Sequence, residues 1–390
     1  MINTKESHSF FYIAGIILII LMVFSVILLI TAIVLTDPVK SSSLSWAFWT
    51  SWGVTTFTSI VGIALLGGAF LWEDRLKQSL RGAIHDKKVC DKVAGYCSKK
   101  ILPVSCSEIN FDWEKGRFNP SIAKFCGKNI YHLEIFCHQY MKRKFFAERM
   151  STVILNEFPL PNGIQTVGVI QRDNSNFDYR DPIVGIVFIC KKTNTLYMIF
   201  RGTLTFGEWK KDFEFDQAKL CCINSNHCFK TCNQNVLVHK GFLRVFSSIE
   251  PSLSDCLLIA KQGFNINRVI VAGHSLGGAL TSLAGFYIAS HPDYKNMEIQ
   301  CYTFGKPRVG NIEYSDTIST KRNLDLFRIE NENDVVTQLP LASTPNFDEP
   351  EKPFIFQHEG TSFKFDNNTG SMGLNHYMPI YLKVLNLELQ

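Results

Sequence analysis

The chain has 390 residues, with 40 Lys and Arg against 35 Asp and Glu, so its formal net charge is +5. This excess is too mild to indicate a nucleic-acid partner. Hydrophobic residues make up 46% and charged residues 19%, which excludes a disordered or acidic-tail protein and leaves ample apolar mass for a core. The length predicts one large domain plus something smaller.

Two uncharged stretches open the chain. The first runs from 9 to 36 and the second from 41 to 72, with Asp37, Pro38 and Lys40 between them. A helix needs about 20 apolar residues to cross a bilayer, whereas a signal peptide has an apolar region of about 7–15. We therefore predict a membrane anchor at 1–75 with transmembrane helices at about 10–36 and 44–72. For the second stretch, which contains several Thr and Gly, the alternative is a buried helix or hairpin of a soluble domain.

The distribution of basic residues predicts how this hairpin is oriented. Lys5 precedes the first span and Lys40 lies in the turn, while residues 73–150 carry a net charge of +7. Lys and Arg near the ends of spans are retained on the cytoplasmic side, and a basic segment beside a span is attracted to an anionic leaflet. We therefore expect a basic juxtamembrane segment at 76–117, and a multi-pass integral membrane protein whose catalytic domain is cytosolic.

Four cysteines gather around one histidine in a short segment of the chain. These are Cys221, Cys222, Cys228 and Cys232, with His227 among them. In a cytosolic domain they would be free thiols or a metal site, and in a lumenal domain they would be disulfides. Their spacing is not one of the familiar zinc patterns, so we predict no metal. The sequon at Asn367 favours the lumen, although such triplets often arise by chance.

Strands alternate with helices over 118–390, which predicts an α/β domain with a mostly parallel central sheet. Runs of β-branched and aromatic residues mark the strands, and those at 182–190 and 195–200 are close enough to form a hairpin. Further strands are expected at 268–272, 297–304 and 324–330. Helices are expected at 123–140, 145–155 and 279–289, and the segments 236–246 and 253–263 lead toward another helix.

A Gly-x-Ser-x-Gly turn follows the strand at 268–272. The residues are Gly273, His274, Ser275, Leu276 and Gly277, and a small-residue helix comes after them. Glycines at the outer positions let the backbone double back, so that the serine stands above the sheet at the start of a helix. We predict that Ser275 is a nucleophile. The alternative is a glycine-rich helix start that only packs against a strand.

A serine nucleophile needs a base, and in such folds the acid and then the histidine follow it in the chain. Three histidines come after Ser275, namely His291, His358 and His376. His291 ends the nucleophile's own helix and so lies at the wrong end of the sheet. His376 precedes the last helical segment, where it can reach over the serine, and we favour it over His358.

Asp334 is the favoured acid, because it lies in the loop that leaves the strand at 324–330. Asp325 starts that strand, and Asp348 and Asp366 occupy less suitable loop or strand positions. A solvated loop aspartate is the alternative reading. For the oxyanion, the backbone N–H of Leu276 supplies one donor, and Thr203 in the loop after 195–200 supplies a second.

Six motifs occur in a characteristic order. They are Phe-Arg-Gly-Thr at 200–203, Trp-x-x-Asp at 209–212, Val-His-Lys-Gly-Phe at 238–242, Gly-His-Ser-Leu-Gly-Gly-Ala at 273–279, Tyr-Thr-Phe-Gly-Lys-Pro-Arg-Val-Gly-Asn at 302–311, and Asn-Asp-Val-Val at 333–336 before Leu-Pro at 339–340. In sequence and order this set resembles the class 3 (fungal-type) lipases. The anchored arrangement is similar to that of membrane-bound diacylglycerol lipases, although with two spans here.

The resemblance implies an α/β-hydrolase fold and hydrolysis of carboxylic esters in glycerolipids. It implies a catalytic triad of Ser275, Asp334 and His376, with Thr203 and Leu276 as oxyanion donors. A lid that contacts substrate is implied after Thr203, carried by Leu204, Phe206 and Trp209. His239 and His274 fall in family motifs and are implied to be structural. The stretch 219–235 is an insertion relative to a compact lid region.

We therefore predict a membrane-anchored serine lipase that acts on di- or triacylglycerol or on phospholipid through an acyl-enzyme, with no cofactor. Its partners would be the bilayer and the glycerolipid substrate, and anchoring would raise the local concentration of that substrate. One alternative is a lipid acyltransferase with the same triad. Another is a non-catalytic membrane-anchored interaction or metal module organised by the cysteines at 221–232.

Overall fold

The computed structural model describes most of the predicted catalytic domain. The described residues are 114–141, 158, 160, 163–172, 183–203, 216–220, 234–294, 296–344, 346, 349 and 351–387. The predicted spans at 10–36 and 44–72 and the predicted helix at 145–155 lie outside these ranges. Among the helices within them, none combines the length and apolar character that crossing a membrane requires.

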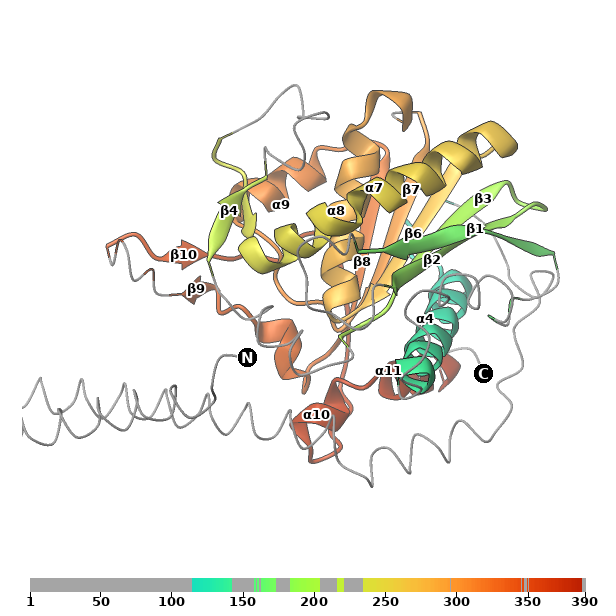
Figure 1. Ribbon diagram of the computed structural model, residues 1–390. Helices are drawn as coiled ribbons and strands as arrows, with labels where there is room; N and C mark the ends of the chain where they lie inside the picture. Colours follow the sequence, from blue (N-terminus) through green and yellow to red (C-terminus); the bar gives the residue numbers. More distant parts are fainter. Residues whose placement is uncertain are drawn as a thin grey trace, which may run out of the picture. The chain divides into compact units, whose positions relative to one another are not determined.

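A seven-stranded sheet forms the centre of the domain (Figure 1). Its strands, in spatial order, are β1 (Ile164–Gln171), β2 (Ile183–Cys190), β3 (Thr195–Phe200), β6 (Arg268–His274), β7 (Glu298–Phe304), β8 (Leu324–Asn331) and β11 (Thr361–Phe365). The pairs from β3 through β11 are parallel, and β1, β2 and β3 form an antiparallel meander. The predicted hairpin of the strands at 182–190 and 195–200 and the mostly parallel sheet are confirmed.

Every residue of β2 and β3 is buried, and so is every residue of β6 after the first. Strands covered on both faces read as continuous apolar runs, because neither face meets water. This is why the sequence marks these strands by apolar runs bounded by polar residues. Each of the strands expected at 268–272, 297–304 and 324–330 is present, with ends that differ by at most two residues.

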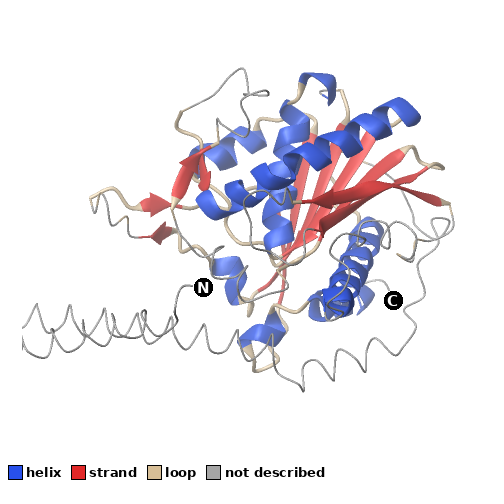
Figure 2. Ribbon diagram, in the orientation of Figure 1, coloured by secondary structure: helices blue, strands red, loops and turns tan. Residues whose placement is uncertain are grey.

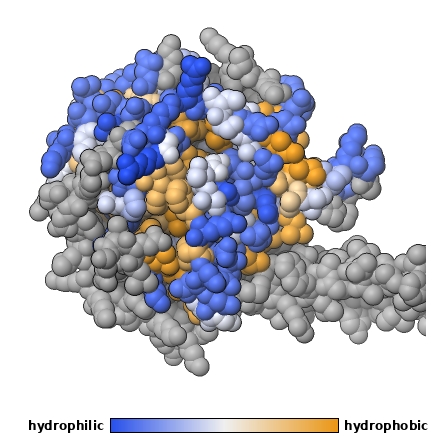
Figure 3. Space-filling view, turned by 180° about the vertical axis from the view of Figure 1, so that it is seen from behind, coloured by the Kyte–Doolittle hydropathy of each residue, from blue (hydrophilic) through white to orange (hydrophobic). Residues whose placement is uncertain are grey.

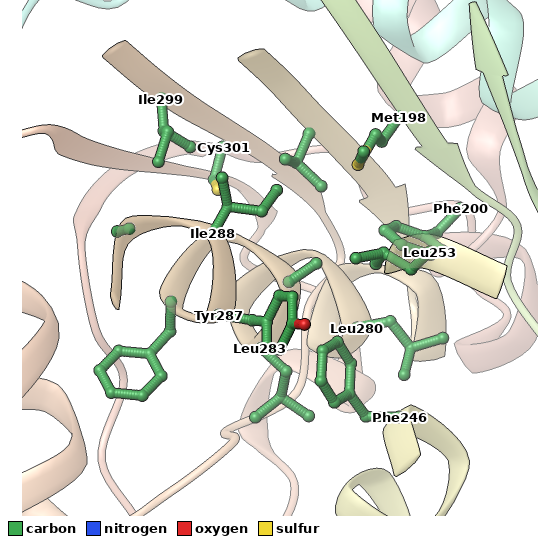
Figure 4. Close-up of a cluster of buried hydrophobic side chains, with 14 of the residues drawn as sticks. Met198, Phe200, Phe246, Leu253, Leu280, Leu283, Tyr287, Ile288, Ile299 and Cys301 are labelled. Carbon is green, nitrogen blue, oxygen red and sulfur yellow. The ribbon is translucent and has the colours of Figure 1, made fainter. Parts of the chain in front are cut away.

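Helices cover both faces of the sheet (Figure 2). On one face lie α7 (Lys240–Gly263) and α8 (Leu276–Ser290), and on the other α4 (Pro120–Met141) and α11 (Met378–Leu387). Each face therefore has its own apolar core. Figure 4 shows side chains of α8 such as Leu280, Leu283 and Ile288 gathered in one cluster with Phe246 and Leu253 of α7 and with residues of the sheet.

The helix α7 departs from the sequence prediction. The two separate segments expected at 236–246 and 253–263 form a short strand, β5 (Leu237–His239), followed by one continuous helix that contains Pro251. A proline inside a helix removes one backbone hydrogen bond. Phe246, Ile249, Leu253 and Leu257 on both sides of it are buried against the core, so that packing maintains the helix across the proline.

The remaining elements lie around the ends of the sheet. The strand β4 (Gln217–Lys219) pairs with β5, and β9 (Ser343–Thr344) pairs with β10 (Phe354–Ile355). The helices α9 (Ile312–Ser319) and α10 (Met372–Asn375) and the 3₁₀ turns η2 (Pro292–Tyr294) and η3 (Val335–Gln338) complete the set. The face seen in Figure 3 carries apolar and polar residues side by side.

Candidate active site

Ser275 occupies a sharp turn between β6 and α8. Its backbone has φ 56° and ψ −123°, in the left-handed half of the map where residues with a Cβ rarely lie. Holding a non-glycine residue there costs about 1–3 kcal/mol, and such strain is concentrated at functional positions. Ser275 is nevertheless nearly buried, with 4% of its surface exposed. The turn therefore presents the serine within the protein, at the first residues of α8.

The glycines on either side of Ser275 are required by close backbone contacts. A Cβ on Gly273 would lie 2.1 Å from the carbonyl oxygen of Gly277. A Cβ on Gly277 would lie 2.5 Å from the carbonyl oxygen of Arg201 and 2.7 Å from that of Phe200. The first glycine allows the chain to fold back on itself, and the second allows α8 to begin directly against the loop that leaves β3.

Asp334 and His376 form a buried carboxylate–imidazole pair. The Asp334 Oδ2 atom lies 2.7 Å from the Nδ1 atom of His376. Asp334 is fully buried and His376 is 7% exposed. A carboxylate at Nδ1 holds the ring in the tautomer that leaves Nε2 as the proton acceptor. The pair thus has the chemistry of a general base with its orienting acid.

Two further donors hold the Asp334 carboxylate. The Tyr381 hydroxyl donates to Oδ2 at 2.6 Å, and the backbone N–H of Val336, in η3, donates to Oδ1 at 2.9 Å. Burial, together with the neighbouring Asp334 charge, raises the pKa of Tyr381 well above its ordinary value, so the phenol stays protonated and donates. Tyr381 was not predicted, because in the sequence it reads only as an apolar position of the last helix.

Ser275 is connected to this pair through the end of β7. Its backbone N–H donates to the carbonyl oxygen of Phe304 at 3.0 Å. The next residue, Gly305, has φ 56°, and a Cβ there would lie 2.8 Å from Asp334 Oδ2 and 3.1 Å from His376 Cε1. The structure thus brings the three predicted residues together at the carboxyl ends of β6, β7 and β8, the edge at which α/β sheets bind their ligands.

His274, beside Ser275, contacts His376 directly. Its Nε2 atom lies 2.8 Å from the backbone oxygen of His376, and the two rings stack with centroids 4.6 Å apart. Its Nδ1 atom lies 2.8 Å from Glu134 Oε1 in α4. Glu134 was not predicted, since no local motif surrounds it and 140 residues separate it from His274.

His239 serves the start of α7. Its Nδ1 atom accepts hydrogen bonds from the backbone N–H groups of Gly241 and Phe242. Burial lowers the pKa of His239 to about 3, so the ring stays neutral and can accept these bonds. It is the N-cap of a helix, in keeping with the structural role that the resemblance implies.

The two predicted oxyanion donors lie on adjoining backbone segments. Leu276 is the first residue of α8, and Thr203 is three residues beyond the end of β3. The contact of Gly277 with the carbonyl groups of Phe200 and Arg201 places these segments against each other. The buried Arg201 side chain holds the loop by donating to the backbone oxygens of Ile183 and Gly202.

The other candidate bases are engaged elsewhere. His291 follows α8 and accepts from the backbone N–H of Asp293, at the opposite end of that helix from Ser275. His358 contacts the carbonyl oxygen of Thr337 at 2.8 Å. Burial and nearby cations, Lys306 foremost among them, lower the pKa of His358 to about 2, so it is a poor proton acceptor.

The other candidate acids do not contact His376 in the described contacts. Asp325 accepts from the backbone N–H of Gly116 near the start of β8. Asp366 directly follows β11, whose last residue pairs with Asn331, so it lies at the same edge of the sheet as Asp334. Its carboxylate accepts from Asn333, at 2.6 Å.

Several predicted features lie outside the described residues. These are the lid residues Leu204, Phe206 and Trp209, the cysteine cluster at 221–232, Asp348, and all of the juxtamembrane segment 76–117 except its last four residues. Within the described ranges, no group of three or more His, Cys, Asp or Glu has the arrangement of a metal site. The lid and the cysteine cluster therefore stay predictions.

The model of the family "Lipase (class 3)" matches residues 197–344. A lipase of Rhizomucor miehei is 26% identical over 176 residues, which are 45% of this chain and 43% of that protein. The secreted mono- and diacylglycerol lipase 1 of Fusarium solani is 28% identical over 164 residues, 42% of this chain and 40% of that one. The chloroplastic phospholipase A(1) DAD1 of Arabidopsis thaliana is 28% identical over 193 residues, which are 46% of this chain and 43% of that protein.

This chain spans about two fifths of the length of these curated relatives. The matched segment begins in β3 and ends in β9, and it includes Ser275 and Asp334. It does not include Glu134, His376 or Tyr381. Over this segment the chain is similar to the class 3 lipases.

Proposed function

We propose that this chain is a membrane-anchored serine lipase that hydrolyses carboxylic esters of glycerolipids through an acyl-enzyme. One observation carries the proposal: the buried Asp334–His376 pair adjoins a strained serine at the start of a helix. The match to the class 3 lipase family over residues 197–344 supports it, and so do the names of two relatives, a mono- and diacylglycerol lipase and a phospholipase A(1). Ser275 is the proposed nucleophile.

In the first step, His376 takes the proton of Ser275 as the serine oxygen attacks the ester carbonyl. Asp334 supports this step in two ways. It fixes the tautomer through the 2.7 Å contact with Nδ1, and its charge stabilises the imidazolium that forms. The imidazolium then gives the proton to the departing glycerolipid alcohol, which leaves the acyl group on Ser275.

Negative charge develops on the carbonyl oxygen during this attack. The backbone N–H of Leu276 is the proposed first donor, because it follows the nucleophile at the positive end of α8. Thr203 is the proposed second donor, through its N–H and hydroxyl. Water then attacks the acyl-enzyme with His376 again as the base, and the fatty acid leaves.

The decisive test is hydrolysis by the full chain in mixed micelles of diacylglycerol, triacylglycerol or phospholipid, with released fatty acid quantified. We expect Ser275→Ala to abolish release, and the preferred lipid to define the substrate class. The matched control is Ser248→Ala in α7, where the hydroxyl only donates to the backbone oxygen of Val245. Equal release by wild type and Ser275→Ala, or no release from any lipid, would overturn the proposal.

The proposed topology places both spans, 10–36 and 44–72, in one membrane and the catalytic domain in the cytosol. The support is the distribution of Lys and Arg along the sequence. The sequon at Asn367 provides a natural reporter, because only a lumenal domain meets the glycosylation machinery. We expect Asn367 to be unmodified and the domain to be digested by protease added to sealed membranes. A glycan at Asn367 would show that the domain lies on the lumenal side and would overturn the proposed topology.

A further inference from the structure

The carboxylate of Glu134 contacts two parts of the candidate active site at once. Glu134 lies in α4, before the segment that matches the lipase family. Its Oε1 atom accepts from the backbone N–H of Gly202 at 2.9 Å and lies 2.8 Å from Nδ1 of His274. Gly202 directly precedes the proposed oxyanion donor Thr203, and His274 directly precedes Ser275.

The space around Gly202 is shaped for this contact. A Cβ on Gly202 would lie 2.8 Å from Glu134 Oε1 and 3.0 Å from His274 Nδ1. Any larger residue at position 202 would therefore displace the carboxylate or the imidazole from its present position. The oxyanion loop is held against α4 and β6 by this junction.

Both ring nitrogens of His274 face oxygen atoms. The Nε2 atom lies 2.8 Å from the carbonyl oxygen of His376, which can only accept, so Nε2 carries a proton. The Nδ1 atom faces Glu134, whose Oε1 also accepts from Gly202. A doubly protonated ring satisfies both contacts with an ionised Glu134. Burial by itself would lower the pKa of His274, but the Glu134 charge and these hydrogen bonds raise it above its ordinary value of 6.5.

His376 is thereby held at more than its Nδ1 atom. Asp334 fixes that atom, while His274 fixes the backbone oxygen and stacks on the ring with 30° between the planes. The other groups that face His274 are Tyr381, with ring centroids 6.1 Å apart, and the Asp334 charge. Glu134 is the partner whose removal would release His274.

We propose that Glu134 is a positioning residue for acyl transfer, which fixes the backbone of His376 through His274 and the loop of Thr203 through Gly202. This inference rests on the proposed function, since it assigns His376 and Thr203 their roles. Glu134 touches neither the substrate nor Ser275 in this scheme. It joins the base and the oxyanion loop, so that both keep their places relative to the nucleophile.

The substitution Glu134→Gln separates this role from simple packing. An amide oxygen can accept from both Gly202 and a protonated His274. Once His274 is neutral, with its proton kept on Nε2, its Nδ1 atom needs a donor, and the amide cannot serve both partners. The substitution removes the charge that most raises the pKa of His274, whereas burial still lowers that pKa, so we expect the variant to lose one contact as the pH rises.

The experiment uses the full chain in detergent micelles and a soluble ester such as p-nitrophenyl butyrate. We expect kcat of Glu134→Gln to be about 10- to 100-fold below wild type at pH 8, with KM changed by less than about threefold. The deficit should shrink toward pH 5. The same trend is expected for the rate at which a fluorophosphonate labels Ser275. The rates at two pH values are compared within one preparation, so that their ratio does not depend on the fraction of protein that was folded in that preparation.

The matched control is Glu250→Gln in α7. This glutamate is buried, and it accepts from Ser254 and Tyr287 far from the site. We expect its kcat to stay within about twofold of wild type at every pH, whatever its melting temperature. Glu250 therefore reports what the loss of a buried carboxylate does by itself.

The outcomes are distinguishable. If Ser275→Ala abolishes activity but Glu134→Gln behaves like Glu250→Gln at all pH values, the positioning role is overturned and the proposed function stands. A deficit of Glu134→Gln that is the same at pH 5 and pH 8 overturns the route through His274. If wild type and Ser275→Ala release product equally, or Ser275 is not labelled, the proposed function fails and the positioning role fails with it.

Discussion

Two buried polar groups of this domain use the same kinds of side chain in different ways. The triad region consists of Ser275, Asp334 and His376. The ion-pair cluster consists of Lys306, Arg328, Glu330, His358 and Glu359, where Lys306 lies 2.7 Å from Glu359 and Arg328 lies 2.8 Å from Glu330. Both contain a histidine beside a carboxylate, but only the triad region adjoins a strained serine.

The histidine of the ion-pair cluster has a strongly lowered pKa. His358 titrates near pH 2, mainly because it is buried and because Lys306 and Arg328 are close to it. This shift makes it a neutral donor to the carbonyl oxygen of Thr337, whose hydroxyl in turn donates to the backbone oxygen of Asp334. A strongly perturbed pKa therefore marks burial among charges, and it identifies a catalytic group only together with geometry.

The largest expected effect breaks the triad region. Asp334→Asn removes the charge that supports the imidazolium and favours the wrong tautomer of His376, so we expect kcat on a soluble ester to fall by about 10⁴. The control is Asp366→Asn, at the same edge of the sheet, where the carboxylate accepts from Asn333. Comparable losses in the two variants would show that charge at this edge matters more than the contact with His376.

The next effect concerns the cluster and its stability. Glu359→Gln leaves Lys306 buried without its partner, which costs about 3–5 kcal/mol of unfolding free energy. We expect the double variant Lys306→Met, Glu359→Leu to recover most of this loss in chemical denaturation. Turnover per fluorophosphonate-labelled Ser275 should be little changed. A large fall in turnover of correctly folded protein would contradict the division between the two regions.

A smaller effect tests the second support of the acid. Tyr381→Phe removes the 2.6 Å hydrogen bond to Asp334 Oδ2 and keeps the ring against Phe304 and Phe365. A hydrogen bond to a charged group contributes about 1.5–3 kcal/mol, so we expect kcat to fall by about 10- to 100-fold. Tyr287→Phe, which removes the bond to Glu250, is the control. Unchanged kcat for Tyr381→Phe would mean that Val336 and His376 suffice to hold the acid.

The smallest expected effect is the change in the free energy of unfolding for each pH unit. His358 and His239 have pKa values lowered to about 2 and about 3, so below pH 6.5 the unfolded chain binds protons that the folded chain does not. Each should therefore cost about 1.4 kcal/mol of stability per pH unit on acidification from 6.5. His274 acts in the opposite sense, because its raised pKa gives a contribution that is present below 6.5 and lost at higher pH.

Unfolding measured between about pH 4 and 6.5 in wild type and His358→Gln checks this prediction. We expect a shallower slope in the variant by about 1.4 kcal/mol per pH unit. The control is His291→Gln, whose side chain accepts from the backbone N–H of Asp293 at an exposed position. Parallel slopes in wild type and His358→Gln would show that His358 is not held neutral in the fold.

The parts of the site that the sequence revealed are those with a local pattern. The turn around Ser275 can be recognised because its backbone requires glycine at two fixed positions. Asp334 can be recognised because it follows a strand that appears in the sequence as an apolar run. Glu134 and Tyr381 have no such pattern, since one lies on a helix and is joined to His274 only in three dimensions, and the other reads as a core residue. Long-range hydrogen bonds leave no periodic trace in a single chain.

The fold shows the same division. Buried strands such as β3 and β6 can be predicted from the sequence because both of their faces need apolar side chains. The continuity of α7 through Pro251 could not be predicted from the sequence. It depends on packing against α8 and the sheet, and this packing outweighs the local tendency of proline to break a helix. The pairing of β11 beside β8 likewise depends on a partner from another part of the chain.

The close contact of Gly277 with the carbonyl groups of Phe200 and Arg201 has a consequence for how the protein can change shape. Less than the width of a methyl group separates the start of α8 from the loop of Thr203. We therefore expect Ser275 and the proposed oxyanion donors to move together, because this contact leaves no room for a hinge between them. Any control of substrate entry has to act through other segments, and a covalent inhibitor of Ser275 would meet a preformed cradle.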